Sequence, residues 1–233
     1  MCESLASSAE PARRRPEPIY DASTVVGHLV HALRQPLSTI ESLAYYLKLA
    51  LGPSESMLSH HLERLRESVL ETGWILADAV HLLQIATPCP QTMDLNELVS
   101  AQIAELSSGR PRWAEPHLAP EPALVRLDVE QGRHLVRNLL VVLRRLAEPT
   151  PLVALETRIT SSEVQLEAWV WLERPPVENL EELFEPFGAD APAGLGLALA
   201  SARRIAEAHG GRLQLRHFQN RQLSLLAALP RAA

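Results

Sequence analysis

The sequence has little of what marks secreted, membrane-spanning or nucleic-acid-binding proteins. Among 233 residues the cysteines are Cys2 and Cys89, too few for a disulfide framework and without the spacing of metal ligands. No apolar run approaches the roughly 18 residues that cross a bilayer, and the arginines at 13–15 precede no hydrophobic stretch, so no secretory signal is predicted. A formal net charge of −6 with interspersed signs argues against nucleic acid or a membrane surface as a partner. We therefore expect a cytoplasmic protein.

Apolar residues make up 46 % of the chain, enough for a packed core, and their pattern changes twice along it. Residues 1–20 are rich in Ser, Ala, Pro and Arg and are predicted to be a disordered tail. Residues 21–88 follow a helical heptad pattern, and residues 92–230 alternate between helical and strand patterns. The predicted order is therefore a tail, a helical hairpin and an α/β domain.

The hairpin is predicted from apolar residues that recur with alternating gaps of four and three, the a/d pattern of a coiled coil or antiparallel bundle. The first run is Val26, Val30, Leu33, Leu37, Ile40, Ala44, Leu47 and Leu51. After the helix breakers at 52–54, the second run is Leu58, Leu62, Leu65, Val69, Thr72, Leu76, Ala79 and Leu83. Each helix would have roughly 30 residues and a length of about 45 Å. Because two such helices bury only one stripe each, we expect a homodimer with a four-helix bundle.

One histidine stands apart from this seam. His31 occupies heptad position b, which faces water, and Gln35 lies one turn later on the same face. Pro36 removes a helical hydrogen bond and frees the carbonyl of Ala32, which predicts a local distortion beside His31. An exposed neutral imidazole is a competent nucleophile toward phosphorus at physiological pH. His28 lies one turn before His31, but with no third ligand nearby we predict no metal site.

The second domain is predicted to be an α+β sandwich, with helices on one face of a mixed sheet. Helices are expected over 94–106, 128–147 and 195–208. Strands are expected over 153–159, 164–172, 212–218 and 222–229. The chain between the first two helices contains Pro and Trp and has no clear period.

Four short motifs resemble those of two-component histidine kinases. His31–Leu37, HALRQPL, resembles the H-box, and Phe184–Phe187, FEPF, resembles the F-box. Gly194–Ala198, GLGLA, resembles the second glycine box, whose backbone amides face phosphate at a helix N-terminus, and Ala208–Gly211 is similar to the segment that follows it. They occur in the family's order over residues 22–230. The resemblance implies a dimerisation and phosphoacceptor hairpin, with His31 as phosphoacceptor, followed by the ATP-binding fold shared with gyrase and Hsp90-type ATPases.

The residual nucleotide site implied by this resemblance consists of Asn138, Arg145, Gly194 and Gly196. Asn138 matches the first asparagine of the family's N-box, but Val142 replaces the second and offers no oxygen to Mg²⁺. Arg145 could meet a phosphate, or it could be a solvated charge on the helix.

Three further departures weaken the expected reaction with ATP. The stretch 170–176, where the first glycine box should lie, has neither its Asp nor its glycines, and Trp169 and Trp171 could fill or border the adenine space. Only residues 188–193 separate the F-box from the second glycine box, too few for a lid over a triphosphate. Ala32 stands where the family places the Glu or Asp that orients the imidazole and takes a proton. Together these changes argue against efficient autophosphorylation.

The leading hypothesis is a phosphotransfer protein in which His31 exchanges a phosphoryl group with the aspartate of a response-regulator receiver domain. The receiver would supply Mg²⁺, so no cofactor is required, and use of Mg-ATP would be weak or absent. One alternative is an active soluble histidine kinase that autophosphorylates His31, and another is a non-catalytic dimeric adaptor. Gln35 could also position a water molecule for hydrolysis. The sequence names neither the receiver nor the signal nor the direction of transfer, and input is expected to come from a partner.

Overall fold

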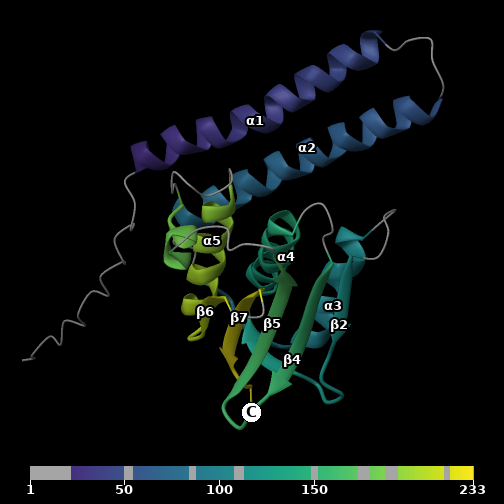
Figure 1. Ribbon diagram of the computed structural model, residues 1–233. Helices are drawn as coiled ribbons and strands as arrows, with labels where there is room; N and C mark the ends of the chain where they lie inside the picture. The colour runs from purple at the N-terminus through teal and green to yellow at the C-terminus, as the bar shows by residue number, and fades with distance from the viewer. Residues whose placement is uncertain are drawn as a thin grey trace, which may run out of the picture.

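In the computed structural model, a long helical hairpin lies across the helical side of an α/β sandwich (Figure 1). The structure describes residues 22–49, 55–83, 88–107, 113–147, 152–172, 179–186, 194–217 and 221–232. The predicted tail over 1–20, the segment 173–178 and the segment 187–193, which contains the predicted short lid, lie outside the described residues. No described helix combines the length and the apolar character needed to cross a membrane.

The hairpin consists of α1 (Ala22–Leu49) and α2 (Glu55–Leu83), which confirms the predicted pair of long helices. Helix α1 remains helical through Pro36, and the Pro36 ring is buried. The hydroxyl of Thr39 donates to the carbonyl of Gln35 at 3.1 Å on the following turn.

The buried stripe of the hairpin differs by one position from the predicted seam. The buried residues are Val25, Ala32, Pro36 and Leu43 on α1 and Ser68, Ile75, Asp78, Ala79 and Leu82 on α2. Several predicted seam residues are instead 40 to 54 % exposed: Val26, Leu37, Leu58, Leu62, Val69 and Leu76. The shift arises because α2 packs on the α/β domain as well as on α1. The buried residues of α2 therefore have to lie where they contact both α1 and that domain. These six residues of the predicted seam lie on the surface of the single chain, whereas Ala79 of the same seam is buried as predicted.

The α/β domain is built on a five-stranded sheet with a separate two-stranded sheet. The main sheet has the order β2 (Ala114–His117), β4 (Val153–Ile159), β5 (Glu163–Trp171), β7 (Gln222–Pro230) and β6 (Arg212–His217). Its β2–β4 pair is parallel and the other pairs are antiparallel. The small sheet pairs β1 (Gln91–Asp94) with β3 (Leu124–Leu127). The predicted α+β sandwich is confirmed, but β1, β2 and β3 were missed because four residues give no readable period.

The helices lie on one face of the main sheet, as predicted. They are α3 (Leu95–Leu106), α4 (Val129–Leu146) and α5 (Leu195–Ala208), and a short 3₁₀ helix, η1 (Leu180–Phe184), was not predicted. Helix α4 begins where the Asp128 carboxylate accepts hydrogen bonds from two backbone amides of the first turn. Its apolar face, with Leu135, Leu139 and Leu143 fully buried, fills the core between the sheet and the hairpin side.

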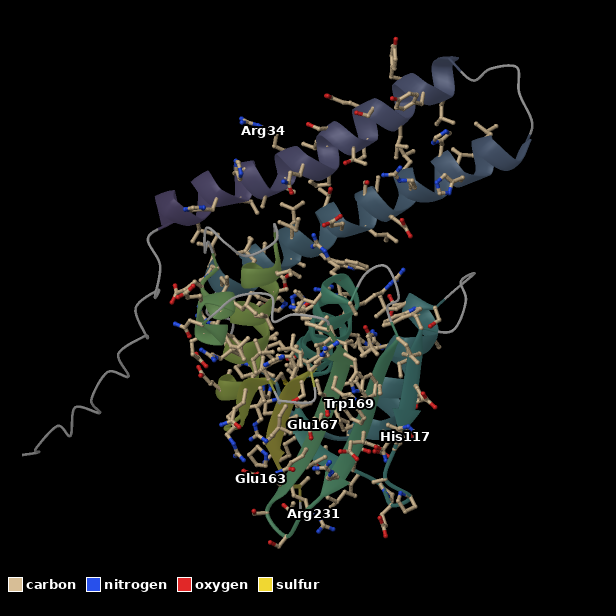
Figure 2. The ribbon with its side chains drawn as sticks, viewed as in Figure 1. Arg34, His117, Glu163, Glu167, Trp169 and Arg231 are labelled. Carbon is tan, nitrogen blue, oxygen red and sulfur yellow. The ribbon has the colours of Figure 1, made fainter. Side chains whose placement is uncertain are left out.

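The two faces of β5 separate the core from the outer surface. Val164, Leu166, Ala168 and Val170 alternate into the core beneath the helices. Trp169 and Trp171 alternate to the opposite face, together with Glu167 (Figure 2), and their rings meet edge to face at 6.5 Å. The expectation that these indoles fill or border an adenine space is therefore wrong, because Asn138 and Gly194 lie on the helical side of the sheet and the indoles lie on the other face. Strand alternation from Val170 already fixes their direction.

Candidate functional site

His31 and Gln35 are both exposed on α1, which confirms the prediction that this face of the helix points to water. Ala32 points the other way and is buried in an apolar cluster that joins the hairpin to α5. Ile75 and Leu82 of α2 and Leu197 and Ala200 of α5 complete that cluster. Helix α2 lies between α1 and the α/β domain (Figure 1), and His31 is an exposed residue of the outer helix α1.

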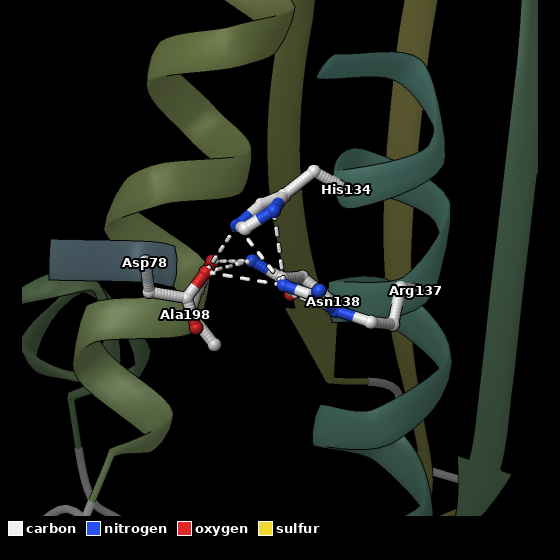
Figure 3. A network of polar contacts seen from close by, with 5 residues as sticks. All are labelled: Asp78, His134, Arg137, Asn138 and Ala198. Atoms are coloured by element: carbon white, nitrogen blue, oxygen red, sulfur yellow. Dashed lines mark hydrogen bonds and ion pairs between the residues drawn. The ribbon is translucent and has the colours of Figure 1, made fainter. Parts of the chain in front are cut away.

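The asparagine of the residual N-box is buried and points toward the hairpin. Asn138 is 2 % exposed, and its amide nitrogen donates to Asp78 Oδ1 at 2.7 Å and to the carbonyl of Ala198 at 3.0 Å. Its amide oxygen accepts from the Arg137 guanidinium at 3.1 and 3.3 Å. The side chain thus joins α4 to both α2 and α5 (Figure 3) and has its hydrogen-bonding groups in use.

Asp78 is the centre of this network. It comes from α2, is 2 % exposed, and accepts from His134 Nε2 at 2.5 Å as well as from Asn138. Because a carboxylate only accepts, His134 carries its proton on Nε2. Arg137 lies 3.7 Å from the carboxylate and also contacts the His134 ring. Burial lowers the pKa of Arg137, and Asp78 and Glu105 partly oppose that shift, so a guanidinium compensates the buried negative charge.

A second histidine borders the network. His81 of α2 meets the His134 ring edge to face, with ring centroids 4.1 Å apart. Burial lowers the pKa of His81 to about 4, and His134 adds to that shift while Asp78 opposes it. His81 is therefore neutral at physiological pH, and its ring packs against His134 as a half-buried apolar surface.

The second glycine box is in close contact with other parts of the chain. Gly194 has a φ of +81° at the start of α5, and a Cβ there would lie 3.1 Å from Cγ1 of Ile75. At Gly196 a Cβ would lie 2.1 Å from the carbonyl oxygen of Glu185, so only glycine lets the F-box segment approach α5. Ile75 is 3 % exposed. The start of the glycine box therefore faces an apolar side chain of the hairpin.

These residues do not fit Mg²⁺ and a triphosphate in the arrangement that the structure adopts. Val142 is fully buried in the core and has no oxygen, and Asn138 is engaged with Asp78. Arg145 lies close to Gly194, as the resemblance implies, but forms an ion pair with Glu71 of α2 at 2.9 Å.

The structure brings together Asn138, Arg145 and Gly194, whereas His31 lies apart from them, exposed on α1. Sequence reasoning missed Asp78, His134 and Arg137, because their pairing joins positions about sixty residues apart. One signal was available: Asp78 is the lone acid in the apolar run 75–83, ILADAVHLL. An acid in such a run needs a buried partner, although the run does not identify it.

Comparisons with known proteins agree with the fold. No family model matches the chain. The chain is 25 % identical to the sensor protein KdpD of Escherichia coli K12 over 216 residues, which cover 89 % of this chain and 24 % of KdpD. It is 26 % identical to the methanogenesis regulatory histidine kinase FilI of Methanothrix harundinacea, over 86 % of this chain and 24 % of FilI. The chain thus spans about a quarter of these relatives.

Two solved structures of similar proteins cover most of the chain. The histidine kinase AdeS of Acinetobacter baumannii superposes with a TM-score of 0.62 at 17 % identity, over 87 % of this chain and 98 % of that one. The histidine kinase ThkA, solved in complex with the response regulator TrrA, gives a TM-score of 0.61 at 16 % identity, over 90 % of this chain and 61 % of that one. The likeness includes both the hairpin and the α/β domain.

Proposed function

Because the chain is a distant relative of the two-component histidine kinases, we propose that it transfers phosphoryl groups through His31 and depends little or not at all on ATP. The neutral imidazole attacks the phosphorus of an aspartyl phosphate on a receiver domain. A nitrogen–phosphorus bond forms, the bond from phosphorus to the aspartate oxygen breaks, and the carboxylate leaves. Return of the phosphoryl group to a receiver reverses these steps. The observation that carries the proposal is the exposure of His31 on α1, the helix of the hairpin that lies farther from the α/β domain.

A receiver suits this site better than ATP as the phosphoryl donor. The receiver brings a reactive acyl phosphate together with its own Mg²⁺, and it needs only an accessible nucleophile. Attack on ATP would instead need a nucleotide site and a base beside the histidine, but Ala32 has no carboxylate and is buried. The contacts of Asn138 and Ile75 support weak or absent use of ATP by this chain.

The expected partners are a receiver domain and a second copy of the chain. The similar kinase ThkA has been solved with the response regulator TrrA, which supports a receiver as the partner. The exposed apolar residues of the hairpin, among them Leu37, Leu62 and Val69, support a homodimer in which two hairpins bury these residues in a four-helix bundle.

Two labelling reactions on the purified protein test the proposal. One contains a receiver carrying a labelled aspartyl phosphate, and the other contains labelled Mg-ATP at the same concentration. We expect a nitrogen-linked label from the receiver and little or none from ATP. Rapid labelling from ATP would identify an active kinase instead, and no labelling from either donor would favour an adaptor without phosphoryl chemistry.

A further inference from the structure

Three of the four residues that correspond to the family's nucleotide site, Asn138, Arg145 and Gly194, contact α2 of the same chain. The contact has a polar part, in which Asp78 accepts from Asn138 at 2.7 Å and from His134 at 2.5 Å. It also has an apolar part, in which Ile75 packs against Gly194 at the start of the glycine box. Ile75 and Asp78 are one turn apart on α2, so a single face of that helix makes both contacts.

The polar part makes this contact specific. A carboxylate at 2 % exposure is tolerated only with donors and a compensating cation around it, and α4 supplies all of these through His134, Arg137 and Asn138. Sliding α2 by one turn would bury Asp78 without partners and would leave Asn138 and His134 unsatisfied. Apolar contacts alone tolerate such shifts more easily. Asp78 therefore sets both the register and the orientation of α2 on the domain.

A second ion pair between α2 and α4 is neither buried nor surrounded by several donors. Glu71 of α2 meets Arg145 of α4 at 2.9 Å, but about a third of each side chain is exposed. Water screens such a pair, and its loss costs little. Glu71 is therefore a matched control for Asp78, because it is also an acid of α2 that pairs with α4.

We propose that the former nucleotide site is an intramolecular docking site whose occupant is α2, with Asp78 as the ligand of Asn138 and His134. In this arrangement the α/β domain acts as a brace that holds the hairpin in one orientation. This goes beyond the proposed phosphotransfer, because docking does not depend on whether His31 carries a phosphoryl group.

Amide hydrogen exchange on the full chain tests the docking site. We expect Asp78→Ala and Asn138→Asp each to accelerate exchange about tenfold or more in the second half of α2 and in α4, because each change leaves a buried charge or donor without its partner. Glu71→Ala should change exchange there less than about twofold. Exchange in β5 and β7 serves as the internal reference for a folded domain.

The reciprocal double variant separates docking from general damage. Asn138→Asp places two carboxylates against each other, but adding Asp78→Asn restores a donor–acceptor pair of reversed direction beside Arg137. We expect the double variant to recover part of the slow exchange that Asn138→Asp alone loses, because an aspartate at 138 still cannot donate to the carbonyl of Ala198. Two results would overturn the docking site: exchange in Asp78→Ala equal to that in Glu71→Ala, or faster exchange that includes β5 and β7 and is not rescued. Labelling of His31 by a phosphorylated receiver, measured on the same samples, tests the proposed function separately.

Discussion

Two regions resemble kinase motifs, one around His31 on α1 and one around Asn138 on α4, and they differ in exposure to solvent. On α1, His31 and Gln35 are exposed, and the neighbouring Ala32 is buried on the other side of the helix. On α4, Asn138 matches the family's N-box but is buried against Asp78 of the hairpin. A motif match therefore identifies a corresponding position, and only its surroundings decide whether a ligand can reach it.

Removing the open histidine gives the largest expected effect. His31→Ala should abolish labelling by a phosphorylated receiver, because it removes the imidazole proposed to attack phosphorus. His28→Ala, one turn earlier on the same exposed helix, should retain labelling and is the matched control. Phosphotransfer followed by acid and base stability of the label measures both. Equal labelling of His31→Ala and the parent protein would exclude His31 as the acceptor.

Removing the buried carboxylate should destabilise the chain more than removing the half-exposed one. Asp78→Ala leaves Asn138 and His134 unsatisfied beside Arg137, which should lower the free energy of unfolding by about 3–5 kcal/mol. Glu71→Ala should lower it by less than about 1 kcal/mol. Urea unfolding followed by circular dichroism measures the two values. If the two losses in unfolding free energy differ by less than about 1 kcal/mol, the docking of α2 through Asp78 is contradicted.

Acid should lower the free energy of unfolding through His81, which packs beside the network of Asp78. The pKa of His81 falls from 6.5 to about 4 on folding, so the unfolded chain binds more protons between these values. His81 thus stabilises the fold above pH 6.5, and this contribution is lost as the pH falls toward 4, by at most about 3 kcal/mol. His81→Phe should flatten that part of the stability profile, whereas His117→Gln, at an exposed position on β2, should not. Parallel profiles for His81→Phe and the parent would contradict the assignment.

Restoring the missing family residue should not reopen the site. Val142→Asn introduces the second N-box asparagine at a position with no exposure, where a new amide has no partner. We expect a loss of about 1–3 kcal/mol in unfolding free energy and no gain in affinity for Mg-ATP. Val142→Ala is the control for lost packing alone. A clear gain in nucleotide affinity would mean that α2 does not block the site.

The smallest expected effect concerns Gln35. Its amide is exposed one turn from His31, where it could orient a water molecule toward a receiver's phosphate. Gln35→Ala should slow dephosphorylation of a receiver by a few-fold and leave transfer to His31 nearly unchanged. Gln35→Glu retains the size of the side chain as a control. Equal dephosphorylation by Gln35→Ala and the parent would remove this role.

The sequence predicted what depends on local pattern. The long helices and strands β4 to β7 have readable periods, and His31 is exposed as predicted, although the heptad frame used to predict it is one residue off. The buried stripe was one residue off, because a heptad does not say whether a stripe meets its hairpin partner or a second chain. The pairing of Asp78 with Asn138 joins two helices through tertiary packing. No local pattern contains that contact.

Calorimetric titration of the full chain with Mg-ATP tests the contrast between the two regions most directly. With Asn138 bonded to Asp78 and Ile75 against Gly194, we predict no binding heat at nucleotide concentrations up to the millimolar range. Binding with micromolar affinity would contradict the account, because the region around Asn138 and Gly194 would then be open to a nucleotide.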